Sequence, residues 1–311
     1  MLSKIRNILN LLRVRQYYKN GLIFVGAFFS GKLIDPSLWY LLIIGFIILC
    51  CASSFNYIIN DIRDIEKDKK HIEKLEKRPL ASGDLSILFA VVLLAILVAI
   101  ISGLIITIIF PNWNFIIMVL LIIITGQLYN HLFKKFAFID ILSLSLIYLW
   151  RALAGCFLIE VFISPWLFLA IFEIALFLVI AKRKGDLILI GEEKAAKHKK
   201  SYDKYSQKLL DQFHIIIAGA LFITYSLYLM IHFDLFSAEN VNLHEYITIL
   251  TIPLSLYIIM RYMYLTSARP EIARSTEKAL LDPGIVIAGI LLLGILTYSF
   301  YLGAFIRLLN L

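Results

Sequence analysis

Long apolar segments constrain this chain more than any other feature of its sequence. Eight of them are long enough to cross about 30 Å of hydrocarbon as helices, and they lie at 38–59, 85–110, 113–131, 137–160, 163–181, 211–233, 245–265 and 284–306. A ninth segment, 17–34, has a shorter apolar core between Lys19 and Lys32. The mean hydropathy of +0.86 over 311 residues excludes an ordinary soluble domain. We therefore predict an all-α integral membrane protein.

The placement of Lys and Arg favours nine spans over eight. Basic residues collect in the cytoplasmic loops of membrane proteins, and with nine spans nearly all of the 30 Lys and Arg residues fall on one side. The exceptions are Lys32 and Arg307 on the other side and Arg151 inside a span. We expect a multi-pass protein of the cell membrane, with its N-terminus in the cytoplasm and its C-terminus outside.

The sequence predicts one membrane domain that covers residues 1–311, because it has no Pro/Gly/Ser-rich linker and its polar loops are short. The larger cytoplasmic loops are expected at 61–84 and 182–210. The net charge of +8 then reflects topology and contact with anionic headgroups or phosphates, rather than nucleic acid. Cys50, Cys51 and Cys156 lie in apolar spans and are expected to be small core residues.

An acidic cluster lies where an apolar span meets a basic loop. On a helix at about 100° per residue, Asp61, Asp64 and Asp68 fall within about 60° of one another. Mg²⁺ prefers carboxylate oxygens and is commonly completed by substrate phosphates, so the cluster predicts a Mg²⁺-diphosphate site at a membrane face. The alternative is a solvated acidic helix end that Arg63 and Lys67 balance.

Two groups of basic residues are candidate phosphate ligands. Arg78 precedes a turn that begins at Pro79, and its guanidinium is suited to bidentate binding of phosphate oxygens. Loop 182–210 opens with Lys182 and Arg183, which are candidates to neutralise a phosphate while Asp186 helps to hold the metal. In both places the alternative is a membrane-flanking basic loop, and we prefer that interpretation for the Lys-rich segment 194–200.

Three further ionisable residues lie in or beside apolar spans. Such groups are costly inside a membrane and mark a pair or a pathway. Arg151 and Glu173 are expected at matching depth in adjacent spans, and we predict that they form a structural ion pair. Asp140 lies near the cytoplasmic start of its span, where it either joins the site or balances Lys134 and Lys135.

Taken together, these motifs resemble those of the UbiA-type membrane transferase superfamily. The resemblance rests on Asn-Asp-x-x-Asp-x-x-x-Asp at 60–68 and on Arg-Pro-Leu-Ala-Ser-Gly at 78–83. Further stretches are similar to one branch, the decaprenyl-phosphate phosphoribosyltransferases. They are Arg-Gln-Tyr-Tyr-Lys-Asn at 15–20, Ile-Asp-Ile at 139–141, Arg-Ala-Leu-Ala-Gly at 151–155, Ala-Lys-Arg at 181–183, Tyr-Ser at 205–206, and Arg-Pro-Glu at 269–271 with Asp282.

The resemblance implies a ring of nine helices around a central cavity that is open to lipid and capped by the cytoplasmic loops. It implies Mg²⁺-dependent transfer of 5-phosphoribose from 5-phosphoribosyl 1-diphosphate to a polyprenyl phosphate. The metal ligands would be Asp61, Asp64 and Asp68, with Asp61, Asp64, Lys182 and Arg183 as catalytic residues. The substrate-binding residues would be Lys19, Asn20, Asn60, Arg78, Lys134, Asp140, Asp186 and Tyr205.

Two other functions stay open at this point. A prenyltransferase that moves an isoprenyl chain from its diphosphate to an aromatic or lipid acceptor would share the fold, the metal and the first motif. A transporter would use the acidic cluster as an ion site, although transporter sites usually lie near the midplane rather than at the rim. The sequence does not determine the oligomeric state or the length of the polyprenyl chain.

Overall fold

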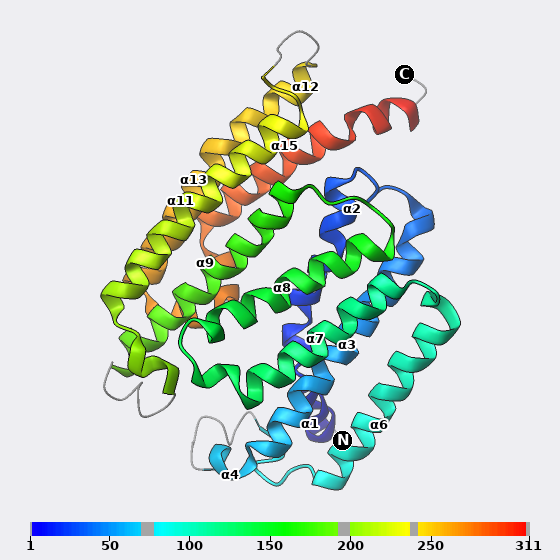
Figure 1. Ribbon diagram of the computed structural model, residues 1–311, viewed down its shortest axis with the longest axis vertical. Helices are drawn as coiled ribbons and strands as arrows, with labels where there is room; N and C mark the ends of the chain where they lie inside the picture. The colour runs from blue at the N-terminus through cyan, green and yellow to red at the C-terminus, as the bar shows by residue number, and fades with distance from the viewer. Residues whose placement is uncertain (1, 70–77, 192–199, 237–241, 309–311) are drawn as a thin grey trace. The chain divides into compact units, whose positions relative to one another are not determined.

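The computed structural model describes residues 2–69, 78–191, 200–236 and 242–308, and within these ranges the chain forms helices and loops without strands (Figure 1). Eight helical segments are long and apolar enough to cross a membrane, as the apolar runs predict. They comprise α3 (Pro36–Arg63), α6 (Ile87–Leu104) with η2 (Ile105–Ile109), α7 (Trp113–His131), α8 (Ile139–Leu158), α9 (Pro165–Ile190), α11 (Gln207–His232), α12 (Leu243–Tyr246) with η5 (Ile247–Leu250) and α13 (Thr251–Ala268), and α15 (Pro283–Leu308).

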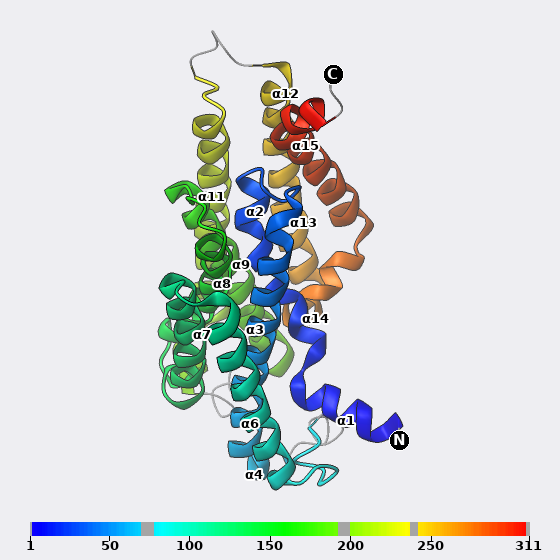
Figure 2. The same ribbon diagram turned by 90° about the vertical axis from the view of Figure 1, so that its right-hand side faces the viewer.

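The predicted ninth span is built differently from the other eight. Residues 14–29 form a 3₁₀ helix, η1 (Val14–Phe24), followed by the short helix α2 (Val25–Phe29), and the two lie beside α3 (Figure 2). At about 2.0 Å per residue in the 3₁₀ part and about 1.5 Å in the α part, this segment is about 30 Å long. It is therefore long enough to cross a membrane, although it has fewer residues than an α-helical span of the same length. The total of nine spans stays a prediction.

Short polar residues determine where several of the long helices begin. The Asp35 carboxylate accepts from the Ser37 backbone N–H at 3.0 Å at the start of α3. Ser86, Asn112 and Ser206 accept in the same way at the starts of α6, α7 and α11. Because each cap satisfies a backbone donor that has no partner within the helix, these helices begin at defined residues.

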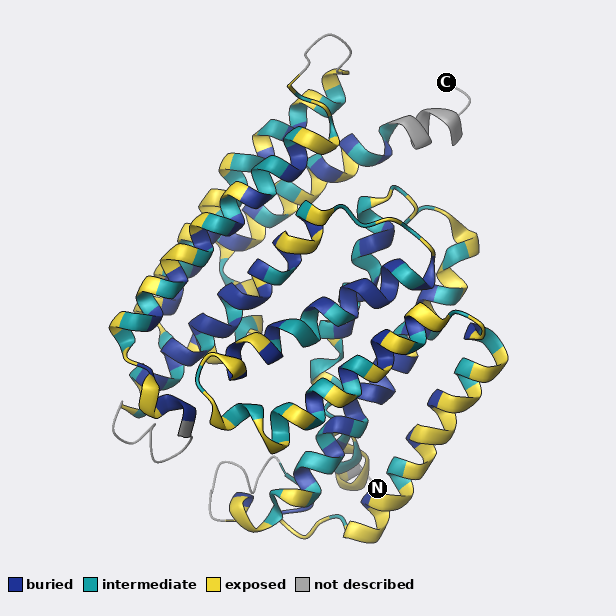
Figure 3. Ribbon diagram, viewed as in Figure 1, coloured by how far each residue is buried: buried dark blue, intermediate teal, exposed yellow. Residues whose placement is uncertain are grey.

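The chain divides into two compact units. The N-terminal unit contains residues 1–132 and 147–162, and the C-terminal unit contains 133–146 and 163–311, so that α8 contributes residues to both. In the C-terminal unit, apolar side chains of α9, α11 and α13 form the core with α14 (Pro270–Arg274). In the N-terminal unit, α6 is exposed along most of its length (Figure 3), and its outer residues are Leu, Ile, Val and Phe, as a lipid-facing helix requires.

Small residues bring η1 and α2 into close contact with α8 inside the N-terminal unit. A Cβ atom added at Gly155 would lie 1.8 Å from the Ile23 carbonyl oxygen, and one at Gly26 would lie 2.5 Å from Cys156 Sγ. Small residues allow helix backbones to approach closely in membranes. Cys156 is buried with a free thiol, as are Cys50 and Cys51, which confirms the prediction that the cysteines are core residues.

The two predicted cytoplasmic loops are shorter than the sequence suggested. Helix α9 continues to Ile190, so the Lys182–Asp186 motif is helical rather than part of a loop. Likewise α3 continues to Arg63 and is followed by α4 (Ile65–Asp68). The predictions for 70–77 and for the Lys-rich segment 194–200 lie largely or wholly outside the described residues.

The close approach at Gly155 leads to a stability prediction. We expect Gly155→Ala to lower the free energy of unfolding by roughly 1–3 kcal/mol or more, because the added methyl overlaps a backbone carbonyl that cannot rotate away. Gly103→Ala, in α6 where nothing lies within 4 Å of the added Cβ, is the matched control and should be neutral or slightly stabilising. Thermal unfolding in detergent compares them, and equal melting temperatures would contradict the packing described here.

Candidate active site

Asp61 is a buried carboxylate in the last turn of α3, with 3% of its surface exposed. Two guanidinium groups donate to it. Arg78 Nη1 lies 2.7 Å from Oδ1 and 2.9 Å from Oδ2, and Arg13 Nη2 also donates to Oδ1. Arg78 Nε is in addition 4.0 Å from Asp68 Oδ2, so that one guanidinium contacts two carboxylates of the predicted acidic cluster.

Arg13 reaches Asp61 because the chain turns sharply after α1 (Leu2–Leu12). Its backbone is left-handed, with φ at 53°, and its guanidinium lies 4.3 Å from the centre of the Tyr57 ring. Burial lowers the pKa of Arg13, and the adjacent Asp61 carboxylate opposes that shift by stabilising the charged form. From the sequence, Arg13 is only one of the basic residues expected on the cytoplasmic side, because 48 positions separate it from Asp61.

The three aspartates do not converge as the helical wheel predicted. The backbone leaves helical geometry at Asp64, which ends α3 and begins α4, so the wheel of one continuous helix does not apply. Within the described ranges, no group of three Asp, Glu, His or Cys side chains is arranged to hold an ion. Asp61 is also a buried, paired residue rather than one on a solvent-facing rim. Its replacement is therefore expected to affect folding as well as any metal.

The donor chemistry at this place nonetheless suits Mg²⁺. Asp61, Asp64 and Asp68 offer only carboxylate oxygens, which a hard divalent cation prefers. Two of these carboxylates already share the positive charge of Arg78. A metal ion would therefore share or compete for these oxygens with Arg78, and the assignment of a metal remains a prediction. Asn60, the other predicted residue of this motif, is half-buried one position before Asp61.

Asn20 organises a second polar group in the N-terminal unit. Its side-chain oxygen accepts from Arg151 Nε at 2.8 Å and from Ser53 Oγ at 3.2 Å, and its amide lies 3.3 Å from Cys50 Sγ. With 1% of its surface exposed, Asn20 holds η1 against α3 and α8. Lys19, next to it, is half-buried, and its Nζ donates to Gln16 Oε1 at 3.3 Å.

The ion pair between Arg151 and Glu173 stays a prediction, because the two residues belong to different units and each has other contacts within its own unit. The Arg151 guanidinium donates to Asn20 and lies 5.4 Å from the centre of the Tyr148 ring, all within the N-terminal unit. Glu173 belongs to the C-terminal unit, where its side chain shares a hydrogen bond with Thr224. Within the N-terminal unit, the neutral amide of Asn20 supplies an acceptor for the buried Arg151 guanidinium.

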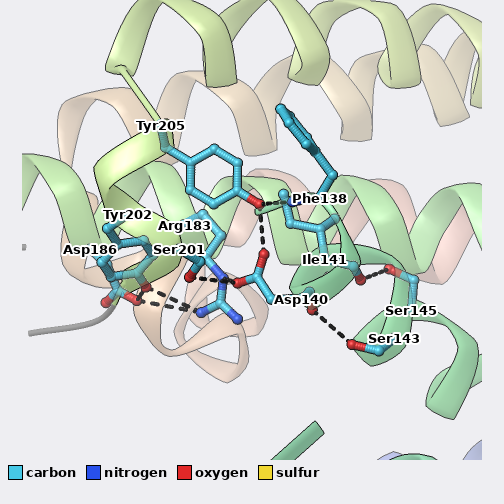
Figure 4. A network of polar contacts seen from close by, with 10 residues as sticks. All are labelled: Phe138, Asp140, Ile141, Ser143, Ser145, Arg183, Asp186, Ser201, Tyr202 and Tyr205. Atoms are coloured by element: carbon cyan, nitrogen blue, oxygen red, sulfur yellow. Dashed lines mark hydrogen bonds and ion pairs between the residues drawn. The ribbon is translucent and has the colours of Figure 1, made fainter. Parts of the chain in front are cut away.

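In the C-terminal unit, Asp140 and Arg183 form the centre of a buried network (Figure 4). Arg183 Nε on α9 lies 2.9 Å from Asp140 Oδ2 on α8, and the two residues are 4% and 0% exposed. The Tyr205 hydroxyl donates to Asp140 Oδ1 at 2.6 Å and accepts from the Phe138 backbone N–H at 2.6 Å. Asp140 therefore joins the polar network as the ion-pair partner of Arg183.

Asp186 extends this network toward α14. The Tyr202 hydroxyl donates to Asp186 Oδ2 at 2.6 Å, and Arg274 Nε lies 2.9 Å from Oδ1, so both carboxylate oxygens have protein partners. A Cβ atom at the adjacent Gly185 would lie 2.7 Å from the Pro270 carbonyl oxygen, which shows how closely α14 packs on α9. A role of Asp186 in holding metal stays a prediction, and its contact with Arg274 fastens α14 to α9.

The structure thus gathers the predicted residues into two groups. The N-terminal unit brings together Asp61, Asp68 and Arg78, and the C-terminal unit brings together Asp140, Arg183, Asp186 and Tyr205. Lys134 and Lys182 are half-buried, and they lie close to Asp140 and Arg183 along the chain. Arg13, Tyr202 and Arg274 were not predicted as site residues, because their partners are far from them along the chain or lie in another element.

The tyrosines of the network are neutral hydrogen-bond donors. Burial is the main cause that raises the pKa of Tyr205 and Tyr202 above the usual value, and the neighbouring carboxylates Asp140 and Asp186 add to the shift. A hydroxyl with a raised pKa keeps its proton throughout the physiological range, so both residues donate to their carboxylates at neutral pH.

Tyr205→Phe tests the contribution of this donor. We expect it to lower the free energy of unfolding by roughly 1.5–3 kcal/mol, because it removes a hydrogen bond to a buried carboxylate and leaves the Phe138 N–H without its acceptor. Tyr40→Phe is the control, since Tyr40 is 57% exposed. Urea or thermal unfolding in detergent measures both, and a Tyr205→Phe protein as stable as the control would show that the network is not formed.

Comparison with known proteins supplies an independent result. A model of the UbiA prenyltransferase family matches residues 21–276. The chain is 28% identical over 264 residues to the decaprenyl-phosphate phosphoribosyltransferase of Corynebacterium glutamicum, covering 82% of this chain and 75% of that one. It is 29% identical over 232 residues to the protein of the same name from Mycolicibacterium smegmatis, covering 72% and 70%.

Solved structures agree on the fold. A UbiA homolog from Archaeoglobus fulgidus, bound to GPP and Mg²⁺, matches with a TM-score of 0.66 at 18% identity, covering 94% of this chain and 97% of that one. A structure described in a study of digeranylgeranylglyceryl phosphate synthase matches with a TM-score of 0.64 at 19% identity, covering 96% and 99%.

Proposed function

Since this protein belongs to the UbiA prenyltransferase family and is a membrane transferase, we propose that it transfers 5-phosphoribose from 5-phosphoribosyl 1-diphosphate to a polyprenyl phosphate. The observation that carries this choice of substrates is the similarity, over 82% of the chain, to a decaprenyl-phosphate phosphoribosyltransferase. The buried Asp61 group with its two arginines supports the use of a diphosphate donor.

The residues at the end of α3 would hold a metal-diphosphate. Asp61, Asp64 and Asp68 are the candidate ligands of Mg²⁺, which, when bound, makes the donor diphosphate a better leaving group. Arg78 and Arg13 now donate to Asp61. Their guanidinium groups are suited to diphosphate oxygens because a guanidinium donates two parallel hydrogen bonds, and they would counter the charge that accumulates as diphosphate departs.

The proposed reaction exchanges one bond at C1 of ribose. An oxygen of the polyprenyl phosphate forms a bond to C1, and the bond from C1 to the diphosphate oxygen breaks with its electron pair leaving on the diphosphate. No general base is required, because the phosphate nucleophile is already ionised at neutral pH. The donor 5-phosphate and the acceptor phosphate both add negative charge, so further fixed cations are needed.

Lys19 and Lys182 are the proposed sources of that charge. Lys19 is held by Gln16 within η1, and Lys182 precedes the buried Arg183 on α9. Because Arg183 is engaged by Asp140 and Tyr202, we assign it to holding the end of α9 that carries Lys182. Asn20 would support the substrates from its group with Arg151 and Ser53. Lys134, Asp140, Asp186 and Tyr205 would do so from the network around Arg183.

A prenyltransferase is the second candidate, because solved relatives of this fold were bound to GPP or DMAPP together with Mg²⁺. One assay separates the two. Membranes containing the protein are offered labelled 5-phosphoribosyl 1-diphosphate with polyprenyl phosphate, and in parallel a labelled prenyl diphosphate with aromatic acids. Labelled phosphoribosyl lipid in the first reaction supports the proposal. Product in the second reaction alone would assign the protein to prenyl transfer.

Asp64→Asn is the sharpest test of the metal-diphosphate assignment, because Asp64 is less buried than Asp61 and its loss should spare the fold. We expect turnover to fall by about 100-fold or more, since Lewis-acid stabilisation is worth several kcal/mol and about 1.4 kcal/mol corresponds to tenfold. Glu66→Gln, an exposed change in the adjacent α4, is the control. Near-normal turnover of Asp64→Asn at limiting Mg²⁺ would refute the assignment.

A further inference from the structure

Helix α1 carries an exposed apolar edge that the rest of the N-terminal unit does not cover. Ile5 and Leu9, one turn apart, are 47% and 46% exposed, whereas Leu11 is fully buried. Lys4 and Arg6 are exposed and lie about 100° to either side of Ile5 on the helical wheel. The helix therefore has an inward face, an apolar outer edge, and a basic residue on each side of that edge.

The contacts at the end of α1 fix this orientation. The Leu12 carbonyl accepts from Ser54 Oγ at 2.9 Å, and Ser54 in turn bonds the Tyr17 hydroxyl at 2.8 Å. Arg13 comes next, with its left-handed turn and its contact to Asp61. Because Leu11 and these groups hold α1 from one side, the helix cannot rotate to bury Ile5 and Leu9 without breaking them.

The position of α1 places that edge at a membrane boundary. In Figure 2, α1 extends sideways from the end of α3 at which the acidic cluster lies. Asp61 marks the point where the apolar part of α3 gives way to charged residues, and Arg13 at the end of α1 touches it. A helix that leaves a transmembrane bundle at this level runs along the interface between hydrocarbon and headgroups.

We propose that α1 is a membrane-surface helix that inserts Ile5 and Leu9 below the headgroups and binds anionic lipids through Lys4 and Arg6. An apolar edge flanked by cations is the arrangement by which interfacial helices bind such membranes, since long basic side chains reach the phosphates while the apolar residues sink beneath them. Charge complementarity favours this occupant over a second copy of the chain, whose own α1 is equally basic.

The proposal gives Arg13 a mechanical support in addition to the contacts that hold Leu11 and Leu12. Arg13 directly succeeds α1, and only η1 holds it from the other direction along the chain. Anchoring of α1 in the interface would therefore restrain the guanidinium that partly neutralises Asp61. This role does not depend on which donor the enzyme uses.

Spin labels on the full chain in lipid nanodiscs test the insertion. Leu9→Cys and Ser3→Cys provide labels about 120° apart around α1, both at exposed positions, and unsubstituted protein measures any labelling of the buried native cysteines. We expect the Leu9 label to collide more with lipid-soluble oxygen and less with a water-soluble nickel complex than the Ser3 label does. Equal nickel access at both positions would overturn the proposal, as would shielding of the Leu9 label from both reagents, which indicates a protein partner.

The same label tests the lipid charge. Shielding of Leu9 from nickel should be greater in nanodiscs that contain phosphatidylglycerol than in pure phosphatidylcholine, and Lys4→Gln with Arg6→Gln should abolish the difference. Lys32→Gln, which removes an exposed charge outside α1, should leave it intact. If shielding is the same in both lipids, or survives in the double variant, the anionic-lipid assignment is wrong.

Discussion

The N-terminal unit depends on how it neutralises one carboxylate. Asp61 lies almost fully buried at the end of a transmembrane helix, where an unpaired charge would be costly. Arg13 and Arg78 meet it from segments on either side of α3 in sequence, so the pair of contacts ties the start of the chain and the turn after α4 to the same helix end. The ends of three segments thereby become one polar group that is suited to bind anions and a cation.

The C-terminal unit solves a similar problem by different means. Asp140 and Arg183 neutralise each other, and tyrosine hydroxyls with raised pKa supply the remaining donors. Asp186 then carries the network to α14 through Arg274. Removing one member of such a buried group leaves another without compensation, so we expect loss of a single partner to cost more than replacement of the pair by apolar residues of similar size.

Features set by local chemistry were predictable from the sequence. Eight spans were identified because an apolar run of sufficient length has few alternatives, although α3 continues past the predicted span 38–59 to Arg63 and so includes Asp61. Partners distant along the chain were not predictable: Arg13 with Asp61, Arg151 with Asn20, and Arg183 with Asp140 are each separated by more than 40 residues. The extension of α9 was missed because a basic run was taken for a loop, whereas Arg183 and Asp186 pair with residues of other elements.

The 3₁₀ geometry of η1 determines how this segment tolerates change. Side chains three residues apart in a 3₁₀ helix eclipse one another, so they form three straight lines rather than a spiral. Tyr17, Asn20 and Ile23 form the line that contacts α3 and α8, whereas Arg15 and Tyr18 lie on an exposed line. Mutational sensitivity along this segment should therefore repeat every third residue, and a one-residue insertion within it would exchange an inner line for an outer one.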